Sequence, residues 1–233
     1  MCGISGAVNW GDINTLALMT DIQSHRGPDD RGLWEKNLVD GTWIGLGSRR
    51  LSILDLSPAG HMPMSTPDGS ITIVYNGEVY NYPQLRTELE AAGYVFRSNC
   101  DTEAVLYLYQ HKGPDAVREL NGMFALAIWD SRQQQLFLAR DHFGIKPLYY
   151  CHQNDRLAFA SEAKALLQLP DAPRRMNLAA LHQYLTFLWV PDPLTMFDGI
   201  FKLPAGHYAI FKDGRLTVTQ YWDLEFPGEG EPF

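Results

Sequence analysis

Residues 1–10 read MCGISGAVNW, and they place a cysteine directly after the first methionine. The small and apolar residues at 2–8 predict a strand that starts at this cysteine. Removal of Met1 would leave the Cys2 thiol beside a free α-amine, whose pKa is about 8, against about 8.5 for a free thiol. The amine could then act as the base and the thiol as the nucleophile. The alternative is that a cysteine at position 2 has no role, since a dipeptide alone is a weak signal.

The composition is that of an ordinary globular protein, with 233 residues of which 45% are apolar and 20% charged. A net charge of −8 argues against nucleic acid or an anionic membrane surface as the main partner. The three cysteines lack regular spacing, so they predict neither a disulfide framework nor a zinc site and favour a reducing, cytoplasmic setting. The N-terminus lacks the pattern of a signal peptide, and no apolar run approaches the ~18 residues that a membrane span requires.

Strand-like runs alternate with a few helical patterns, which predicts an α+β layered fold. Asn76-Gly77 and Asp213-Gly214 are turn signals that would end or connect strands, and Asn14 would cap the first helix. The expected helices cover 15–25, 83–93, 102–113 and 179–187. The expected strands cover 2–8, two segments within 41–56, 70–77, 122–130, 134–141, 147–151 and 156–161, with a closing hairpin at 206–222.

Eight motifs follow one another along the chain and together are far more specific than any one of them. They are MCGISG at 1–6, HRGPDD at 25–30, RRLSILDLSPAGHMPM at 49–64, YNGEVYNY at 75–82, CDTEA at 100–104, LNGMFALAIWD at 120–130, ARDHFGIKPLYY at 139–150 and FASEAKAL at 159–166. In this order they closely resemble the glutamine amidotransferase domain of the asparagine synthetase family, whose nucleophile is an N-terminal cysteine. The resemblance covers residues 1 to about 165 and continues more loosely through 187–211 and 220–224.

The resemblance implies that Cys2, after removal of Met1, is the nucleophile. It also implies that Asn76 and Gly77 form the oxyanion hole. Elementary chemistry agrees, because an Asn amide beside a Gly backbone N–H supplies two donors for the oxygen that becomes negative when a thiolate adds to an amide. Without the family match, Asn76-Gly77 would more simply be a hairpin turn.

The resemblance further implies a site for the two charged ends of glutamine. Arg50 would bind the α-carboxylate, for which a guanidinium offers a rigid fork of donors. Asp101 would bind the α-amine, with Glu78 beside it, and the backbone of Leu51 and Ile53 would lie in the same pocket. The simpler interpretations are that Asp101 is a helix cap and Glu78 an exposed turn residue.

Two arginines adjoin in the RRLSILDL motif, and neighbours in a strand point to opposite faces. Only one of them should therefore face the pocket, and the resemblance selects Arg50 over Arg49. Arg26, in the HRGPDD motif, would have a supporting role in a loop that covers the site. Cys100 and Cys151 are interpreted as buried structural thiols. The seven histidines show no metal-ligand spacing, so no metal site is predicted.

The implied fold is a four-layer αββα sandwich of the N-terminal nucleophile hydrolase type. We expect a glutaminase core at 2–165, a continuation and linking region at 166–225, and a linker or chain end at 226–233. The pyrophosphate-binding loop of a synthetase domain is absent from the sequence. The expected partners are L-glutamine, a synthetase domain outside this chain and, as one option, a second copy of the chain. No cofactor is expected here, and ATP and Mg²⁺ would belong to the synthetase domain.

The expected reaction is hydrolysis of L-glutamine to glutamate and ammonia through a cysteinyl thioester. Asparagine is the default product in the synthetase domain, and amidation of a peptide, antibiotic or polysaccharide precursor is the alternative. There are three other hypotheses. The first is an amidotransferase that serves a sugar phosphate, a phosphoribosyl substrate or glutamate synthase. The second is an N-terminal nucleophile acylase, and the third is a catalytically silent regulatory domain. The motifs RRLSILDL and GIKPLYY point away from the first of these hypotheses.

Overall fold

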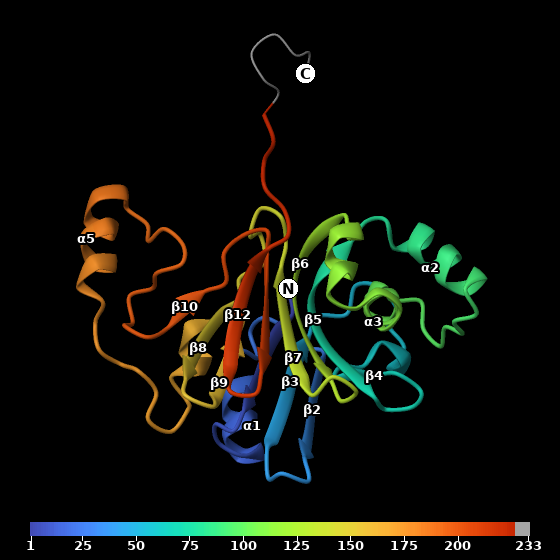
Figure 1. The fold of residues 1–233 in the computed structure, drawn as a ribbon, viewed down its shortest axis with the longest axis horizontal. Helices are drawn as coiled ribbons and strands as arrows, with labels where there is room; N and C mark the ends of the chain where they lie inside the picture. The colour runs from blue at the N-terminus through green and yellow to red at the C-terminus, as the bar shows by residue number, and fades with distance from the viewer. Residues whose placement is uncertain (227–233) are drawn as a thin grey trace.

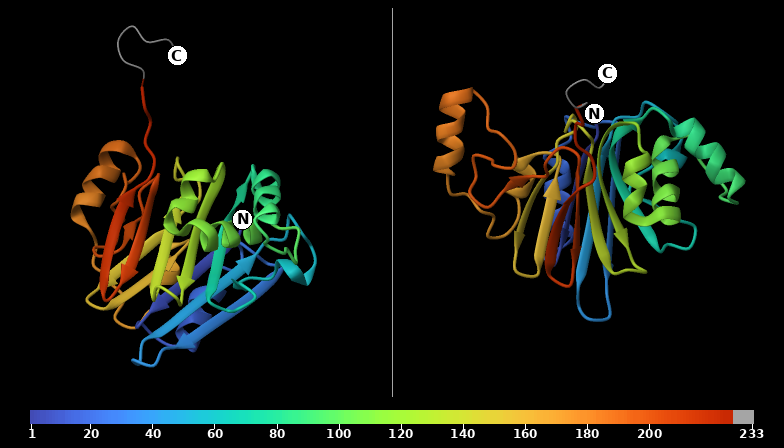
Figure 2. Two further views of the ribbon diagram at one scale, coloured as in Figure 1. Left: turned by 45° about the vertical axis from the view of Figure 1, so that its right-hand side comes forward. Right: turned by 45° about the horizontal axis from the view of Figure 1, so that its top comes forward.

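Two six-stranded sheets lie face to face in the computed structural model, which describes residues 1–226 (Figures 1 and 2). All described strand pairs are antiparallel. The first sheet, in spatial order, consists of β10 (Phe201–Lys202), β8 (Tyr149–Gln153), β9 (Arg156–Ala160), β1 (Gly3–Val8), β3 (Trp43–Arg50) and β2 (Asp30–Asn37). The second consists of β12 (Arg215–Gln220), β11 (His207–Lys212), β7 (Gln135–Arg140), β6 (Gly122–Asp130), β5 (Ile71–Val79) and β4 (Met64–Ser65).

The innermost core lies between the two sheets. Ile4 and Leu46 from the first sheet pack with Val74, Leu138 and other residues from the second, and all four are fully buried. Burial of apolar surface contributes about 25 cal/mol per Å², so the contact between the two sheets is a main source of stability. β1 is an inner strand of the first sheet, between β9 and β3, so the residue just before it lies at the end of an inner strand.

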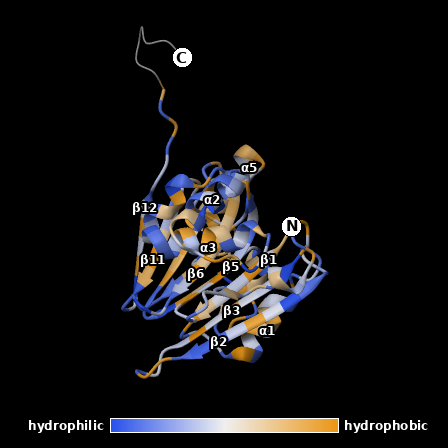
Figure 3. Cartoon of the chain, turned by 90° about the vertical axis from the view of Figure 1, so that its right-hand side faces the viewer, coloured by the Kyte–Doolittle hydropathy of each residue, from blue (hydrophilic) through white to orange (hydrophobic). Residues whose placement is uncertain are grey.

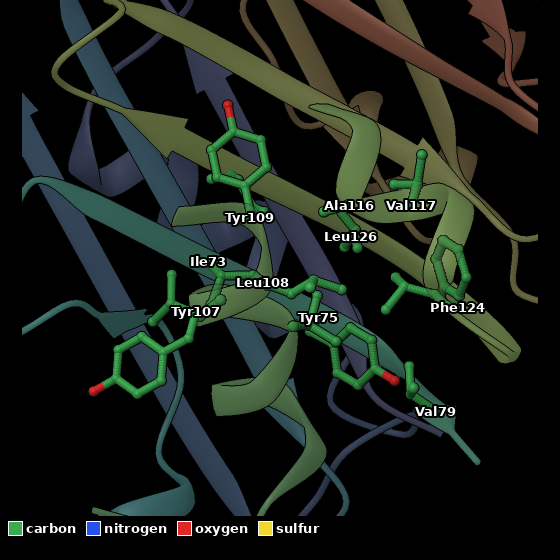
Figure 4. Packing of buried hydrophobic residues seen from close by; sticks show 14 of the residues in the cluster. Ile73, Tyr75, Val79, Tyr107, Leu108, Tyr109, Ala116, Val117, Phe124 and Leu126 are labelled. Atoms are coloured by element: carbon green, nitrogen blue, oxygen red, sulfur yellow. The ribbon is translucent and has the colours of Figure 1, made fainter. Parts of the chain in front are cut away.

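Helices cover the outer face of each sheet. The first sheet carries α1 (Ile13–Asp21) and α4 (Ala163–Leu166), and the second carries α3 (Asp101–Lys112), on which α2 (Tyr82–Ala91) packs (Figure 1). Figure 4 shows the outer core of the second sheet, a cluster to which Tyr75 and Phe124 contribute from the strands and Tyr107 and Leu108 from α3. The layer order is helix, sheet, sheet, helix, so the predicted αββα sandwich is confirmed.

Three local predictions are wrong. Asp12 caps α1 in place of Asn14, because its Oδ1 accepts the Thr15 N–H at 2.8 Å. Asn76-Gly77 forms no turn, since β5 continues through it to Val79 and pairs with β6 along its whole length. Only one of the two strands expected within 41–56 forms, as β3 ends at Arg50 and the chain then runs irregularly to a 3₁₀ turn at Pro58–Gly60.

The segment after α4 returns to both sheets. It contains α5 (Leu178–Phe187), β10 and the β11–β12 hairpin, which turns at Asp213-Gly214 as predicted. Figure 3 shows apolar residues on α5, and of these Leu185 is exposed. Among residues 1–226, no helix is long and apolar enough to cross a membrane. The linker or chain end predicted at 226–233 lies, apart from Phe226, outside the described residues.

Candidate active site

A cavity of about 100 Å³ opens where the start of β1, the end of β3, the end of β5 and the start of α3 converge. Eight of the nine residues that the sequence singles out line it, and Arg26 is the exception. The lining consists of Met1, Cys2, Arg50, Leu51, Ile53, Leu54, Met62, Tyr75, Asn76, Gly77, Glu78, Cys100, Asp101, Thr102, Met123 and Lys146. Segments that lie up to 144 positions apart, from Cys2 to Lys146, therefore meet in one site.

Cys2 stands one residue before the first paired residue of β1, which is Gly3 opposite Arg49. Its Sγ lies 3.8 Å from the carbonyl oxygen of Leu51, to which the thiol donates. Burial raises the pKa of the Cys2 thiol, while the Leu51 contact, the positive N-terminus and the Arg50 charge act in the opposite direction. Met1 lies on the cavity wall, so residue 1 shares the space in front of the thiol.

Asn76 presents an unsatisfied donor inside the molecule. The residue is 1% exposed, and its Nδ2 has no hydrogen-bond partner among the described residues. A buried polar atom without a partner costs about 1–3 kcal/mol, so such atoms are rare unless something else binds them. The position on the cavity wall makes this amide a ready donor for an oxygen of a bound molecule.

The backbone N–H of Gly77 supplies a second donor. Phe124, opposite Gly77, uses both its backbone N–H and C=O toward Asp141 on the β7 side, so Gly77 and Phe124 are not a hydrogen-bonded pair. The Gly77 N–H therefore points to the other edge of β5, as does that of Val79, which donates to Asp101 Oδ2 at 3.0 Å. A Cβ at position 77 would lie 2.6 Å from the Met123 carbonyl, so the backbone here requires glycine.

Arg50 is the cation of the cavity. It is 7% exposed, and its Nη2 donates to the carbonyls of Leu54 and Asp55 at 2.8 and 2.7 Å, which leaves the other nitrogens for a ligand. Gly60 makes room for it, because a Cβ there would lie 2.2 Å from Nη2. Arg49 turns away, with Nε donating to the Gly27 carbonyl, as the alternation along a strand predicts.

Two carboxylates face the cavity. Asp101 is the first residue of α3, and its Oδ2 accepts the Tyr75 hydroxyl at 2.8 Å as well as the Val79 N–H. Burial raises the pKa of Asp101 despite these hydrogen bonds. Burial also raises the pKa of Glu78. The nearby Asp101 charge raises this pKa further, and the Lys146 charge lowers it. Asp101 is not the helix cap that the simpler interpretation proposed, because Cys100 occupies the cap position.

Several lining residues were not singled out from the sequence. Tyr75 lies in the strand expected at 70–77, and its hydroxyl donates to Asp101. Cys100 is buried as expected but also lines the cavity, with its Sγ 3.0 Å from the Ser98 Oγ. Lys146 lies within the quoted ARDHFGIKPLYY motif, which is the one signal that could have identified it. Cys151 is buried in the core under α1 and α4, as predicted.

Arg26 lies behind the cavity wall. Its Nε donates to the carbonyl oxygen of Cys2 at 2.9 Å, and its Nη1 to Glu162 Oε1 at 3.1 Å. It thus contacts the backbone of the cysteine residue and does not line the cavity. Among residues 1–226, no group of three or more His, Cys, Asp or Glu side chains is placed to hold a metal ion.

Comparison with known proteins gives a family match over nearly the whole chain. The family model described as "Glutamine amidotransferase domain" matches residues 1–222. Asparagine synthetase (glutamine-hydrolyzing) 1 of Bacillus subtilis is 40% identical over 234 residues, which cover 97% of this chain and 36% of that protein. Amidase chry2 of Gibberella zeae is 38% identical over 242 residues, which cover 97% of this chain and 35% of that protein.

The curated relatives are much longer than this sequence, which spans about a third of their length. Among solved structures, glutamine phosphoribosylpyrophosphate amidotransferase of B. subtilis matches with a TM-score of 0.67 at 18% identity. That match covers 95% of this chain and 49% of the other. At this identity the likeness concerns the fold, which agrees with the two-sheet sandwich described above.

Proposed function

The chain belongs to the glutamine amidotransferase domain family, and on that premise we propose that its cavity hydrolyses L-glutamine to glutamate and ammonia. The observation that carries the proposal is the buried, unpartnered Nδ2 of Asn76, a residue that lines the same cavity as Cys2. A thiol nucleophile and a free buried donor in one cavity are the two parts that acyl transfer from an amide requires.

The proposed binding mode uses the two opposite charges of the cavity. The Arg50 guanidinium binds the α-carboxylate of glutamine, and the Asp101 carboxylate, with Glu78 beside it, binds the α-ammonium. The backbone at Leu51 and Ile53 lines the path of the side chain. This places the side-chain amide of glutamine toward Cys2, where it competes for the space that Met1 now lines.

The proposed reaction begins with removal of Met1, which frees the α-amine of Cys2. That amine takes the thiol proton, and the thiolate attacks the amide carbon. Asn76 Nδ2 and the Gly77 N–H donate to the oxyanion, and the proton returns to the leaving nitrogen as ammonia departs. Water then attacks the γ-glutamyl thioester, releases glutamate and restores the thiol. The chemistry requires a reduced thiol, which supports the predicted cytoplasmic setting.

We further propose that the ammonia serves an ATP-dependent amidation in a synthetase domain of an asparagine-synthetase-like protein. The support is the 40% identity to a protein of that name that is almost three times as long. Asparagine is the default product, while the match to a protein named an amidase keeps amidation of another acid as the alternative. ATP and Mg²⁺ would act in that domain, and the glutaminase half-reaction needs no cofactor. A homodimer stays a prediction from the sequence.

The test is the intact mass of the chain, treated first with a methionine aminopeptidase, with and without a diazo-ketone glutamine analogue. We expect loss of the methionine mass and one covalent adduct at Cys2, blocked by excess glutamine. Cys2→Ala should remove the adduct, whereas the matched variant Cys151→Ala, which changes a thiol outside the cavity, should keep it. Loss of methionine without an adduct would overturn the glutaminase proposal and favour a regulatory glutamine-binding domain.

A further inference from the structure

The backbone of the nucleophile residue has little support from the sheet. Strand pairing of β1 starts at Gly3, so Cys2 lies beyond the ladder. Its carbonyl oxygen instead receives the Arg26 Nε at 2.9 Å. Once Met1 is removed, no residue precedes Cys2 to restrain it. The contact with Arg26 then becomes a principal restraint on the position of both the thiol and the α-amine.

Arg26 is in turn held by Glu162. The Nη1 of Arg26 donates to Glu162 Oε1 at 3.1 Å, and the arginine side chain is 8% exposed. Glu162 has two further polar partners, His25 Nε2 at 2.9 Å from Oε1 and Lys164 Nζ at 3.0 Å from Oε2. Burial opposes ionisation of Glu162, but hydrogen bonds from His25, Lys164 and Arg26 outweigh it and lower its pKa. The carboxylate is therefore ionised at neutral pH.

Glu162 is also fixed relative to β1. The residue before it, Ser161, donates its backbone N–H to the Ile4 carbonyl at 2.9 Å and accepts the Ile4 N–H on its Oγ at 3.0 Å. Ile4 is two residues from the nucleophile. Glu162 is thus connected to Cys2 indirectly in two ways. One connection runs through the hydrogen bonds between Ser161 and Ile4, and the other runs through the guanidinium of Arg26. It does not line the cavity, so it would not touch a substrate there.

We propose that Glu162 is a positioning residue, which holds Arg26 so that the guanidinium fixes the carbonyl of Cys2 and keeps the thiol aligned with Asn76. The inference rests on the proposed function for its kinetic readout. An error of about 1 Å in the placement of a reacting group can cost about 100-fold in rate. Charge neutralisation at Glu162 would free the guanidinium to rotate away from the Cys2 carbonyl, while the binding groups Arg50 and Asp101 stay in place.

The experiment compares Glu162→Gln with Lys164→Gln in the full chain after removal of Met1. Lys164→Gln is the matched control because it removes a partner of the same carboxylate without touching Arg26. We expect Glu162→Gln to lower kcat by about 10–100-fold with KM changed less than about threefold, and Lys164→Gln to change neither. A second pair, Arg26→Gln with and without Glu162→Gln, should show that the double variant is no slower than Arg26→Gln alone.

A readout independent of turnover separates this inference from the proposed function. The rate of Cys2 alkylation by iodoacetamide, at equal thermal stability, should differ between Glu162→Gln and the wild type but not for Lys164→Gln. Glu162→Asp serves if the glutamine variant does not fold, because it keeps the charge but shortens the reach to Arg26. The inference is overturned if the wild type is active and the folded Glu162 variants keep its kcat and its rate of Cys2 alkylation. It is also overturned if the losses in kcat from Arg26→Gln and Glu162→Gln add up in the double variant. An inactive wild type with altered Cys2 alkylation contradicts only the glutaminase proposal.

Discussion

Asn76 is a buried side chain whose amide nitrogen has no hydrogen-bond partner among the described residues. A protein interior normally pairs every buried amide, and the cost of leaving one unpaired is about 1–3 kcal/mol. Asn81, a few residues along, shows the usual arrangement, with Nδ2 donating to the Glu119 carbonyl and Oδ1 accepting the Asn121 N–H. The two asparagines therefore differ in what their amides are used for, and they form a natural pair for mutagenesis.

We expect Asn76→Ala to lower glutaminase kcat by about 10²–10³-fold, because one of two oxyanion donors is lost. KM should change little, and thermal stability should stay the same or rise because an unpaired donor is removed. Steady-state release of glutamate and a thermal melt measure the two effects. Asn81→Ala should do the reverse, with lower stability and near-normal kcat. Asn76→Ala with kcat within about threefold of wild type would contradict the proposed role.

Asp101 gives a pH-dependent prediction. Burial raises its pKa, so the folded state favours the protonated acid. The stabilisation from this preference is complete at pH below the ordinary carboxyl range, and it is lost as pH rises through the raised pKa. As pH rises through this raised pKa, ionisation of Asp101 therefore destabilises the fold relative to a neutral side chain of the same shape.

We expect Asp101→Asn to raise Tm at pH 7 and to have a smaller effect at pH 4, because the amide oxygen can still accept from Tyr75 and Val79. The KM for glutamine should rise by about 10–100-fold, since a charged partner of the ammonium is worth about 1.5–3 kcal/mol. Melting curves at the two pH values and KM at pH 7 test this. A lower Tm at pH 7 would show that the ionised carboxylate is stabilising.

At the residue scale, motif matching identified the groups whose chemistry the reaction needs, but not those that support them. Strand geometry predicted that only one of Arg49 and Arg50 faces the cavity, and the family resemblance selected Arg50. Tyr75 begins the quoted YNGEVYNY motif but was not singled out, because an aromatic residue in an apolar strand is typical of a core. Its hydroxyl meets Asp101 only through a contact across 26 positions of sequence, which no local pattern records.

At the scale of elements, the helix α1 illustrates the limit of local signals. Asp12 and Asn14 are both good capping residues, two positions apart, and the sequence does not distinguish them. In the structure Asp12 Oδ1 accepts from both the N–H and the hydroxyl of Thr15, whereas Asn14 donates to Asp12 Oδ2. The cap is therefore the residue before the helix whose side chain accepts a free N–H of the first turn.

We expect Asp12→Ala to lower Tm by about 2–4 °C, because a helix N-terminal donor loses its acceptor. Asn14→Ala should change Tm by less, since its side chain contacts only the cap. A thermal melt of both variants under the same buffer conditions decides between the two residues. Equal losses would mean that the capping interaction is shared.

Strand β5 shows why a strong turn signal can fail. Asn-Gly is the best local sequence for a two-residue hairpin, yet β5 passes through it without interruption. The cause is tertiary, because every residue from Ile71 to Val79 has a partner on β6. The small glycine then serves close approach to the Met123 carbonyl instead of a turn. The pairing of β5 with β6 therefore overrides the local preference of Asn-Gly for a turn. Only the family resemblance suggested another role for this dipeptide.

At the scale of the whole molecule, the layered arrangement of strands and helices could be predicted from the sequence, whereas no observation bears on the predicted domain boundaries. Apolar strands and a few amphipathic helices predict only an α+β layered fold, because such elements bury their apolar faces in layers, whereas the αββα order came from the family resemblance. The predicted division at residue 165 stays a prediction. The later strand β11 pairs with β7 and places Ala209 and Phe211 in the core between the sheets. Tyr221 donates its hydroxyl to the Arg140 carbonyl at 2.9 Å.

We expect a chain cut after residue 165 to lose cooperative unfolding, because β7 would have an unpaired edge and the core between the sheets would be open to water. A chain cut after residue 222, where the family match ends, should melt within about 4 °C of the full chain. Thermal melts and urea titrations, both followed by tryptophan fluorescence, compare the two. A cooperative transition at the same midpoint in the shorter chain would establish 1–165 as an autonomous unit.

Met1 lines the cavity in front of Cys2, and this position has a practical consequence. Under the proposed chemistry, any residue ahead of Cys2 converts the base into an amide and occupies room that glutamine needs. An affinity tag fused at the front of the chain would therefore silence the enzyme without unfolding it, whereas the same tag at the other end would leave the amine free. Activation would then depend on cleavage of one peptide bond in the sequence, the bond between Met1 and Cys2.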